Sequence, residues 1–357
     1  MWADLSGVAL AWVAADNRGV HQDFRIADPH GGTPAAALPL PPTQPFAQDL
    51  YPAAHDDLHL LWLDAAAPGD QRLYSALITR SAEVKRGPVQ VSNQPTWRYS
   101  AASGALGSLM IVASGGLAAE PALFAYFLDA AGRPRLAGED PLVPDADWPA
   151  LLAGSSGQLV LCWLRAADQA AWCAPFANGQ IGTPRQVAPA LRLVRGDRLT
   201  GFSAAADSSH LYLFWNLTRS GGAAETWYTA SPSDLWDAAP PRRLGITVMN
   251  DGYETGFNTG GAQAAEPGDS WARWSAPLAW ALDPLPVAAQ IGETLGLIYF
   301  HNGRPTGYQT VVEAARLIDA PALAADRERF LYLAWAQPGE EAADLLLVTR
   351  KLLAFNP

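Results

Sequence analysis

An apolar run that ends in an aromatic residue, or once in alanine, recurs along this chain at a nearly constant spacing. This recurrence constrains the fold more than any other feature. The seven runs end at Trp12, Trp62, Ala113, Trp163, Trp215, Tyr299 and Trp335. Their successive intervals are 50, 51, 50, 52, 84 and 36 residues. Four near-equal intervals indicate internal duplication of a unit of about 50 residues.

Each unit contains its parts in a fixed order. A segment of small residues precedes the apolar run, a turn with Asp, Gly or Pro follows it, and a second apolar strand comes next, as at 73–78 and 123–128. A strand that begins near Gly-Pro or Thr-Pro ends the unit, as at 87–91 and 183–187. Small side chains suit an innermost strand, because the strands of a propeller crowd toward its axis.

Four strands in about 50 residues are typical of a propeller blade. We therefore predict an all-β fold, a seven-bladed β-propeller of four-stranded antiparallel blades that occupies residues 1–357 as a single domain. A β-sandwich also has short strands, but it does not predict a constant period. Residues 246–290 interrupt the period and are predicted to form an irregular insertion.

Two of the predicted hairpins have an internal register that can be tested. If each hairpin turns midway between its aromatic runs, the opposed residues are Cys162 and Cys173, Trp163 and Trp172, Trp215 and Trp227, and Phe214 and Tyr228. Opposed cysteines allow either a cross-strand disulfide or two buried thiols that act as small apolar residues. Two cysteines without nearby histidines do not make a zinc site.

The charge and hydropathy of the chain argue against two classes of partner. The net charge is -11, and Lys85 and Lys351 are the only lysines. Such a balance repels phosphate groups, so we expect no nucleic-acid partner. No run of about 18 apolar residues is present, so we expect no direct membrane insertion. The first residues lack a signal-peptide pattern, which leaves the location open: cytoplasmic, or extracytoplasmic after removal of a leader.

The insertion at 246–290 gathers aromatic, polar and charged residues in a segment that is long for a connection. Long structured insertions on a repeat scaffold often carry function. Trp and Tyr rings stack on sugars while Asp, Asn and Arg side chains form hydrogen bonds. The predicted ligand-binding residues are Asp251, Tyr253, Glu254, Asn258, Trp271, Arg273 and Trp274. The alternative is a blade with altered outer strands, in which the tryptophans only pack.

No catalytic or metal-binding signature stands out in the sequence. The six histidines are dispersed, and His59 and His210 lie within apolar strands, as half-buried strand residues do. Nucleophile-elbow, zinc-protease and P-loop motifs do not occur, and the acidic residues of the insertion lack the spacing of a calcium loop. We therefore predict no catalytic residues, no metal and no cofactor.

Two short motifs carry a resemblance to a known family. Residues 227–236, WYTASPSDLW, keep the Ser, Asp and Trp of an Asp-box turn, and Phe24-Arg25-Ile26 is similar to a Phe-Arg-Ile-Pro motif with Ala27 in place of Pro. The chain thus resembles the sialidase-like, or BNR/Asp-box, β-propeller superfamily. This resemblance implies the blade architecture over nearly the whole chain, whereas Arg25 alone matches the sialidase catalytic set.

Two functions follow from these patterns. We expect a non-enzymatic β-propeller that binds a protein or glycan partner on one face, because catalytic signatures are missing and propellers are rigid platforms. The alternative is a sialidase-like glycoside hydrolase or lyase that acts on a carbohydrate. Its candidate residues are Arg25, Asp251, Tyr253 and Glu254. An enzyme would gather carboxylates, Arg and Tyr around the axis, whereas a binding module would present aromatic and neutral polar groups on one rim.

A closed propeller commonly joins its termini within one blade, so we expect the two ends of the chain to lie side by side. Deleting the last twelve residues, 346–357, is predicted to lower the melting temperature sharply, because the ring would lose strand pairing in its last blade. Circular dichroism melting of the full-length and shortened proteins measures the difference. An unchanged melting temperature would contradict this closure.

Overall fold

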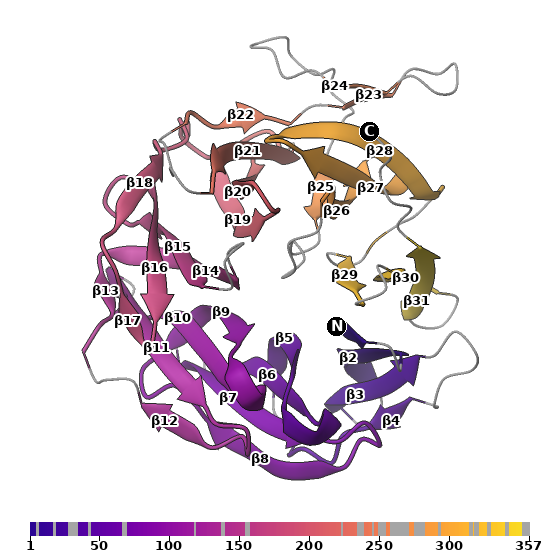
Figure 1. The fold of residues 1–357 in the computed structure, drawn as a ribbon. Helices are drawn as coiled ribbons and strands as arrows, with labels where there is room; N and C mark the ends of the chain where they lie inside the picture. Colours follow the sequence, from indigo (N-terminus) through magenta and orange to yellow (C-terminus); the bar gives the residue numbers. More distant parts are fainter. Residues whose placement is uncertain are drawn as a thin grey trace.

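The chain forms a ring of antiparallel β-sheets around a central axis (Figure 1). The computed structural model describes residues 1–357 except 5–6, 17–18, 28–34, 42–43, 66–69, 118, 137–139, 154–157, 223, 234–238, 245, 249–254, 258–270, 275–282, 292–293, 314–316, 318–320, 327–329, 340–342 and 352–357. For strands including 246–248, 255–257, 271–274 and 343–351, only the backbone is described.

The first three sheets follow one another along the chain. The first contains β1 (Trp2–Asp4), β2 (Gly7–Asp16), β3 (Gly19–Ala27) and β4 (Ala36–Ala37). The second contains β5 (Pro45–Pro52), β6 (Leu58–Ala65), β7 (Gln71–Ile78) and β8 (Val84–Gln90). The third contains β9 (Thr96–Ser103), β10 (Leu109–Leu117), β11 (Glu120–Leu128), β12 (Pro134–Leu136) and β13 (Val143–Pro144).

The next three sheets repeat this order. The fourth contains β14 (Ala146–Ala153), β15 (Leu159–Arg165), β16 (Ala171–Ala177), β17 (Gln180–Ile181) and β18 (Arg185–Ala188). The fifth contains β19 (Arg198–Ala206), β20 (His210–Thr218), β21 (Ala224–Pro232) and β22 (Arg242–Arg243). The sixth contains β25 (Trp271–Trp274), β26 (Leu285–Ile291), β27 (Thr294–His301) and β28 (Arg304–Val312).

The remaining strands form a three-stranded sheet and a separate pair. The last sheet contains β29 (Ala322–Ala325), β30 (Phe330–Pro338) and β31 (Ala343–Lys351), and a separate pair is formed by β23 (Ile246–Val248) and β24 (Thr255–Phe257). Two 3-10 turns are present, η1 (Ala54–Asp56) and η2 (Ala105–Gly107). In the part of the chain that the structure describes, no helix is long and apolar enough to cross a membrane.

The fold is therefore an all-β propeller with four-stranded antiparallel blades, as predicted. The predicted number of seven such blades is corrected, because six sheets of the described chain have four or five strands and the sheet β29–β31 has three. The strand that begins each sheet lies nearest the axis, and β8, β12, β22 and β28 lie at the periphery (Figure 1).

Buried apolar clusters hold neighbouring sheets together. The structure contains seven of them, one between each sheet and the next around the ring. Strand β6 shows how one strand serves two clusters. Leu60 and Trp62 pack toward the first sheet, whereas Leu61 and Leu63 pack toward the third. Since successive side chains of a strand point to opposite faces, a strand buried on both faces reads as a continuous apolar run.

The predicted hairpin register is confirmed. Opposed partners in the structure are Cys162 and Cys173, Trp163 and Trp172, Trp215 and Trp227, and Phe214 and Tyr228. Of the two alternatives for the cysteines, the structure has the disulfide, and both residues are buried between the fourth and fifth sheets.

One of the seven apolar runs was assigned to the wrong strand position. The run that ends at Tyr299 lies in β27, the third strand of its sheet, whereas β26 occupies the second position. Both strands are apolar and buried, so the hydropathy pattern does not distinguish them. This misassignment explains only part of the irregular intervals of 84 and 36 residues, because Ala289, which pairs with the inner strand, still lies 74 residues after Trp215. It also means that the predicted insertion contains regular blade strands, namely residues 271–274 and all but the last residue of 285–291.

The first blade does not take its inner strand from the other end of the chain, as closure within one blade would require. The first sheet has its own inner strand, because β1 pairs with β2 from Trp2 to Asp4. Side chains join the first sheet to the last, and Ala3 and Leu10 pack against Tyr332 in one cluster. Residues 352–357 lie outside the described chain, so the meeting of the two ends stays a prediction.

His59 is more deeply buried than a half-buried strand residue. Its side chain is 0% exposed, and its Nε2 lies 2.8 Å from the carbonyl oxygen of Gly107 in the neighbouring sheet. Burial lowers the pKa of His59, and the hydrogen bond to Gly107 and the carboxylates of Asp129 and Asp57 only partly offset this effect. The ring is therefore neutral, with Nε2–H donating to Gly107. His210, by contrast, is partly exposed, as predicted.

A buried neutral histidine should make the protein less stable in acid. The unfolded chain binds a proton on this histidine below its ordinary pKa of 6.5, whereas the folded protein resists it. Because the unfolded state binds more protons there, the free energy of unfolding falls as the pH drops through that value. We expect His59→Gln to reduce the fall in melting temperature between about pH 7.5 and about pH 5.5. An equal fall in both proteins would contradict the neutral buried state.

Candidate functional site

The inner strands share a local irregularity near their beginnings. In five sheets, the register between the inner strand and its neighbour shifts within the first half of the inner strand. The shifts lie between Phe46 and Asp49, Thr96 and Arg98, Asp147 and Ala150, Leu199 and Gly201, and Trp271 and Arg273. Such bulges bend a strand and re-aim its side chains. Because every blade has the same strand order, all five bulges lie at the same end of the ring.

The bulge of β5 brings a carboxylate next to two tyrosines. Ala47 has a positive φ of 48°, and its carbonyl oxygen accepts a hydrogen bond of 2.5 Å from the hydroxyl of Tyr99 on β9. Asp49 follows on β5 and lies close enough to the Tyr99 hydroxyl for each group to affect the pKa of the other. Tyr51 lies two residues further along β5 and faces the same side of the strand.

The surroundings of this group raise the pKa of the Asp49 carboxyl. Asp49 is accessible to water, but the surrounding inner strands restrict its hydration, and this desolvation raises its pKa. The Met1 amino group and the Tyr99 hydroxyl act in the opposite direction and are smaller effects. Desolvation and the nearby Asp49 charge also raise the pKa of Tyr51 and Tyr99 well above the ordinary value. Both phenols therefore stay protonated and serve as hydrogen-bond donors, not bases.

The bulges of β9 and β14 hold a second group of polar side chains. Asp147 accepts hydrogen bonds from Arg98 Nη1 at 2.9 Å and from the Trp97 indole at 3.2 Å. The Arg98 guanidinium carbon lies 3.6 Å from the centre of the Trp148 ring, a cation–π contact. Trp148 itself has a positive φ of 58°. Asp147 thus positions a cationic group and a flat aromatic ring against each other.

These residues are here named the axial cluster: Asp49, Tyr51 and Tyr99, with the group Arg98, Asp147 and Trp148 on the adjacent inner strands. Aromatic rings with a few directed polar groups suit a sugar, whose apolar faces stack while its hydroxyls form hydrogen bonds. A carboxyl of raised pKa adds a group able to transfer a proton. In the described chain, no three His, Cys, Asp or Glu side chains are grouped to hold a metal ion.

The residues predicted from the insertion lie outside this description. Asp251, Tyr253, Glu254 and Asn258 fall outside the described residues, and for Trp271, Arg273 and Trp274 only the backbone is described. That backbone belongs to β25, the inner strand of the sixth sheet, with Arg273 opposite Gln290 and Trp274 opposite Ala289. Their side-chain contacts therefore stay predictions.

The residues of the sialidase-like motifs do not meet at the axis. Arg25 is exposed on β3, which β2 separates from the inner strand β1. The Ser of the Asp-box-like segment, Ser231, is buried in β21, and 234–238 lie outside the described residues. The arginine of the sialidase-like motif thus lies on the third strand of its blade, with β1 and β2 between β3 and the axis.

Comparison with known proteins supports the fold. No family model matches the chain, and no curated protein matches it. Among solved structures, the α-L-arabinanase of Penicillium chrysogenum with arabinobiose is 14% identical over 85% of this chain and 93% of its own, with a TM-score of 0.52. The α-L-arabinofuranosidase of Fusarium graminearum is 10% identical over 86% and 93%, with a TM-score of 0.52. The polysaccharide lyase Uly1 is 9% identical over 95% and 87%, with a TM-score of 0.56.

These neighbours establish the β-propeller but not its sialidase-like type, because they are glycoside hydrolases that act on arabinan-type sugars and polysaccharide lyases. They also correct the main functional expectation. A non-enzymatic binding module was expected, yet the structures that share this fold over most of the chain are carbohydrate-active enzymes. The enzymatic alternative is the better supported of the two.

Part of the axial cluster was visible in the sequence but was interpreted only as packing. Tyr51 and Tyr99 each begin a small-residue segment, 51–54 and 99–102, that was assigned to the inner strands. Asp49 precedes one of these tyrosines by two residues, a position that shares its face on a strand. The bulges left no signal, because Ala47 and Trp148 are not residues that usually mark a positive φ.

Proposed function

We propose that this protein is a carbohydrate-active enzyme that cleaves glycosidic bonds at the axial cluster. The observation that carries the proposal is Asp49, a water-accessible carboxyl whose pKa is raised by desolvation and which lies close to the Tyr99 hydroxyl on the next inner strand. A carboxyl that keeps its proton nearer to neutral pH is suited to protonate the leaving glycosidic oxygen.

Hydrolysis of a glycoside uses two carboxyl groups, one as acid and the other as base or nucleophile. Asp49 is the acid in this proposal, and its proton goes to the oxygen of the departing sugar. Asp147, on the inner strand β14, is the second carboxylate, and Arg98 and Trp97 fix its orientation. Tyr99 donates to Asp49 after the proton has left and stabilises the carboxylate that remains.

The Arg98–Trp148 pair provides the binding surface for the sugar in this proposal. A tryptophan ring can accept the C–H face of a pyranose or furanose ring, and a guanidinium donates to hydroxyl or carboxylate oxygens. The contact of 3.6 Å between Arg98 and the Trp148 ring immobilises both side chains before a ligand arrives. Preorganisation of this kind reduces the entropy lost on binding.

Hydrolysis is favoured over elimination by the tyrosines. A lyase needs a strong base to remove a proton next to a carboxylate, and phenols whose pKa is raised well above the ordinary value are poor bases at neutral pH. The structural neighbours include both classes, an arabinanase that was solved with arabinobiose and an ulvan lyase that was solved with a uronic-acid saccharide. Their substrates support a glycan as the ligand.

Three structural expectations belong to this proposal. Residues 1–357 act as a single domain, the sheet β29–β31 is its seventh blade, and the insertion at 246–290 extends the sugar-binding surface. The placement of Trp271, Arg273 and Trp274 on the inner strand β25 supports the last of these, because the axial cluster also lies on inner strands.

The first test is the loss of activity when the proposed acid is removed. The wild-type protein should release reducing ends from at least one member of a panel of arabinan, ulvan and sialylated glycans. Asp49→Asn should lower kcat by roughly 100-fold or more, because the amide is too weak an acid to protonate the leaving oxygen. Asp56→Asn, an exposed carboxylate on η1, is the matched control and should leave kcat unchanged. Full activity of Asp49→Asn would overturn the assignment.

Tyr99→Phe supplies a second readout of the same site. The Tyr99 hydroxyl lowers the pKa of Asp49, so its removal should raise that pKa and move the alkaline limb of the pH–activity profile to higher pH.

Ultraviolet absorbance of the products distinguishes hydrolysis from elimination, because elimination leaves an unsaturated sugar and hydrolysis does not. An unsaturated product would replace the hydrolase assignment with a lyase.

The contribution of the insertion is tested separately by binding. Replacing Trp271 and Trp274 by Ala should weaken the affinity for the best saccharide of the panel by about tenfold or more, because each ring that stacks on a sugar contributes roughly 0.5–1.5 kcal/mol beyond its buried area. Isothermal titration calorimetry measures the affinity. If the double variant keeps the wild-type affinity and melting temperature, Trp271 and Trp274 of β25 are not part of the site.

A further inference from the structure

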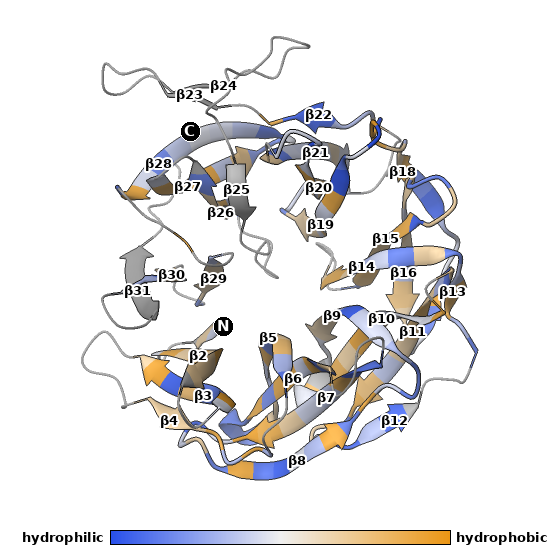
Figure 2. Ribbon diagram, turned by 180° about the vertical axis from the view of Figure 1, so that it is seen from behind, coloured by the Kyte–Doolittle hydropathy of each residue, from blue (hydrophilic) through white to orange (hydrophobic). Residues whose placement is uncertain are grey.

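A concave site lies at the rim of the ring, away from the axial cluster. It has a volume of ≈ 180 Å³ and is lined by His210, Tyr228, Arg242, Asn302 and Arg304, among others. We call it the rim pocket. These residues come from the fifth sheet and from the β27–β28 turn of the sixth, whereas the axial cluster belongs to the second, third and fourth sheets. Strand β22, which carries Arg242, is strongly hydrophilic (Figure 2).

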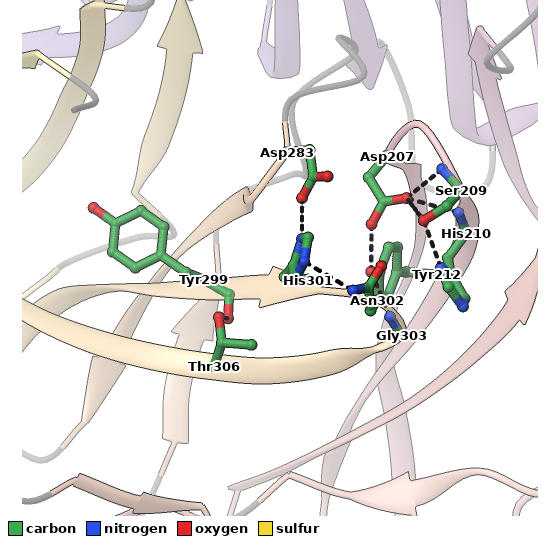
Figure 3. Close-up of polar contacts among 10 residues, drawn as sticks. All are labelled: Asp207, Ser209, His210, Tyr212, Asp283, Tyr299, His301, Asn302, Gly303 and Thr306. Carbon is green, nitrogen blue, oxygen red and sulfur yellow. Dashed lines mark hydrogen bonds and ion pairs between the residues drawn. The ribbon is translucent and has the colours of Figure 1, made fainter. Parts of the chain in front are cut away.

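A chain of hydrogen bonds fixes the wall between the two sheets (Figure 3). Asp207 Oδ2 accepts a hydrogen bond of 2.5 Å from the Tyr212 hydroxyl, and that hydroxyl oxygen accepts one of 3.0 Å from the backbone N–H of Gly303. Gly303 has a φ of +75°, and a Cβ atom there would lie 3.1 Å from the His210 ring. A glycine in this turn is therefore needed both for its conformation and for its close approach to His210.

The acidic groups beside the pocket already have partners. Asp207 Oδ1 accepts the backbone N–H groups of Ser209 and His210, each at 2.7 Å. Asp283 lies 2.5 Å from Nδ1 of His301, whose Nε2 lies 2.8 Å from the side-chain nitrogen of Asn302. These contacts hold both carboxylates in the wall, and Figure 3 shows them directed at their partners.

The hydroxyl of Tyr228 is a buried polar group of the pocket that lies beside the Arg242 guanidinium. Tyr228 is 1% exposed, and its oxygen has no partner that meets hydrogen-bond geometry in the described chain. Burial raises the pKa of this phenol, although the nearby charges of Arg242 and Arg304 partly offset the effect. The hydroxyl is thus a protonated donor beside two guanidinium groups. An unsatisfied buried hydroxyl costs free energy unless a ligand or water satisfies it.

The two arginines of the pocket also differ from their neighbours. Arg243, the next residue on β22, lies 3.2 Å from Glu225, and Arg219 pairs with Glu225 and Asp197. Arg242 and Arg304 form no ion pair with any residue that the structure describes, and both are exposed. Two uncompensated guanidinium groups on one pocket are notable in a chain of net charge -11, because they attract anions that the rest of the surface repels.

We propose that the rim pocket binds one oxyanion group, a sulfate, phosphate or carboxylate, through Arg242, Arg304 and the Tyr228 hydroxyl. Guanidinium groups donate paired hydrogen bonds to such groups, and a phenol adds a further donor. The volume of ≈ 180 Å³ is below the roughly 300–1,000 Å³ of pockets that enclose drug-sized molecules. The ligand is therefore a small anion or a single anionic group of a larger molecule.

Equilibrium dialysis against radiolabelled sulfate, phosphate and glucuronate tests this site. At least one probe should bind saturably with one site per chain, and the probe that binds most tightly identifies the group. The double variant Arg242→Gln and Arg304→Gln should weaken that binding by roughly 100-fold, about tenfold for each lost charge-assisted contact. Tyr228→Phe should weaken it by about tenfold, with the fold kept because the ring still packs on Phe300.

The matched control is Arg192→Gln with Arg195→Gln, two exposed arginines before β19 whose loss changes the net charge equally. This variant should bind like the wild type. Two results would overturn the proposal. One is that no probe binds saturably, and the other is that the control variant loses as much binding as the Arg242→Gln and Arg304→Gln variant. The inference does not rest on the catalytic assignment, because Asp49→Asn should bind the probes normally and the pocket variants should keep their glycan cleavage.

Discussion

Burial of both faces of each sheet against its neighbours is the interaction on which the ring depends. An isolated blade would leave two apolar faces in water, and fully burying one large apolar side chain contributes about 1.5–3 kcal/mol. Seven clusters close the circle, including the one that joins the first sheet to the last. The ring is therefore stable only as a whole, since removing one sheet exposes the faces of two others.

Packing between the sheets allows the inner strands to contain irregular backbone. Five inner strands begin with a bulge, and at two of these bulges Ala47 and Trp148 adopt positive φ values that such residues rarely take. The second and third strands of the blades keep their ladders there, so the local irregularity is supported by the packing behind it. Polar side chains of neighbouring inner strands thereby contact one another, as Arg98 contacts Asp147. The rim pocket uses the same principle at an interface between two sheets, where Gly303 and Tyr212 fix the wall.

The arginines near the two sites differ in whether they have a carboxylate partner. Most of the described arginines near the sites have a carboxylate partner, as Arg98 has Asp147 and Arg219 has Glu225. Such pairs hold positions and add little stability at an exposed surface. Arg242 and Arg304 lack such partners in the described chain, which is the reason that the rim pocket, in an acidic protein, offers a site for an anion.

The sequence by itself determined the all-β class, the repeat of about 50 residues and the register of two hairpins, because periodicity and opposed residues such as Cys162 and Cys173 are local properties. It did not distinguish β26 from β27, since two adjacent buried strands have the same hydropathy. Only the tertiary structure decided which polar residues meet. Asp49 with Tyr99, and Tyr228 with Arg304, come from different blades, and their approach depends on ring geometry and bulges that no local pattern records.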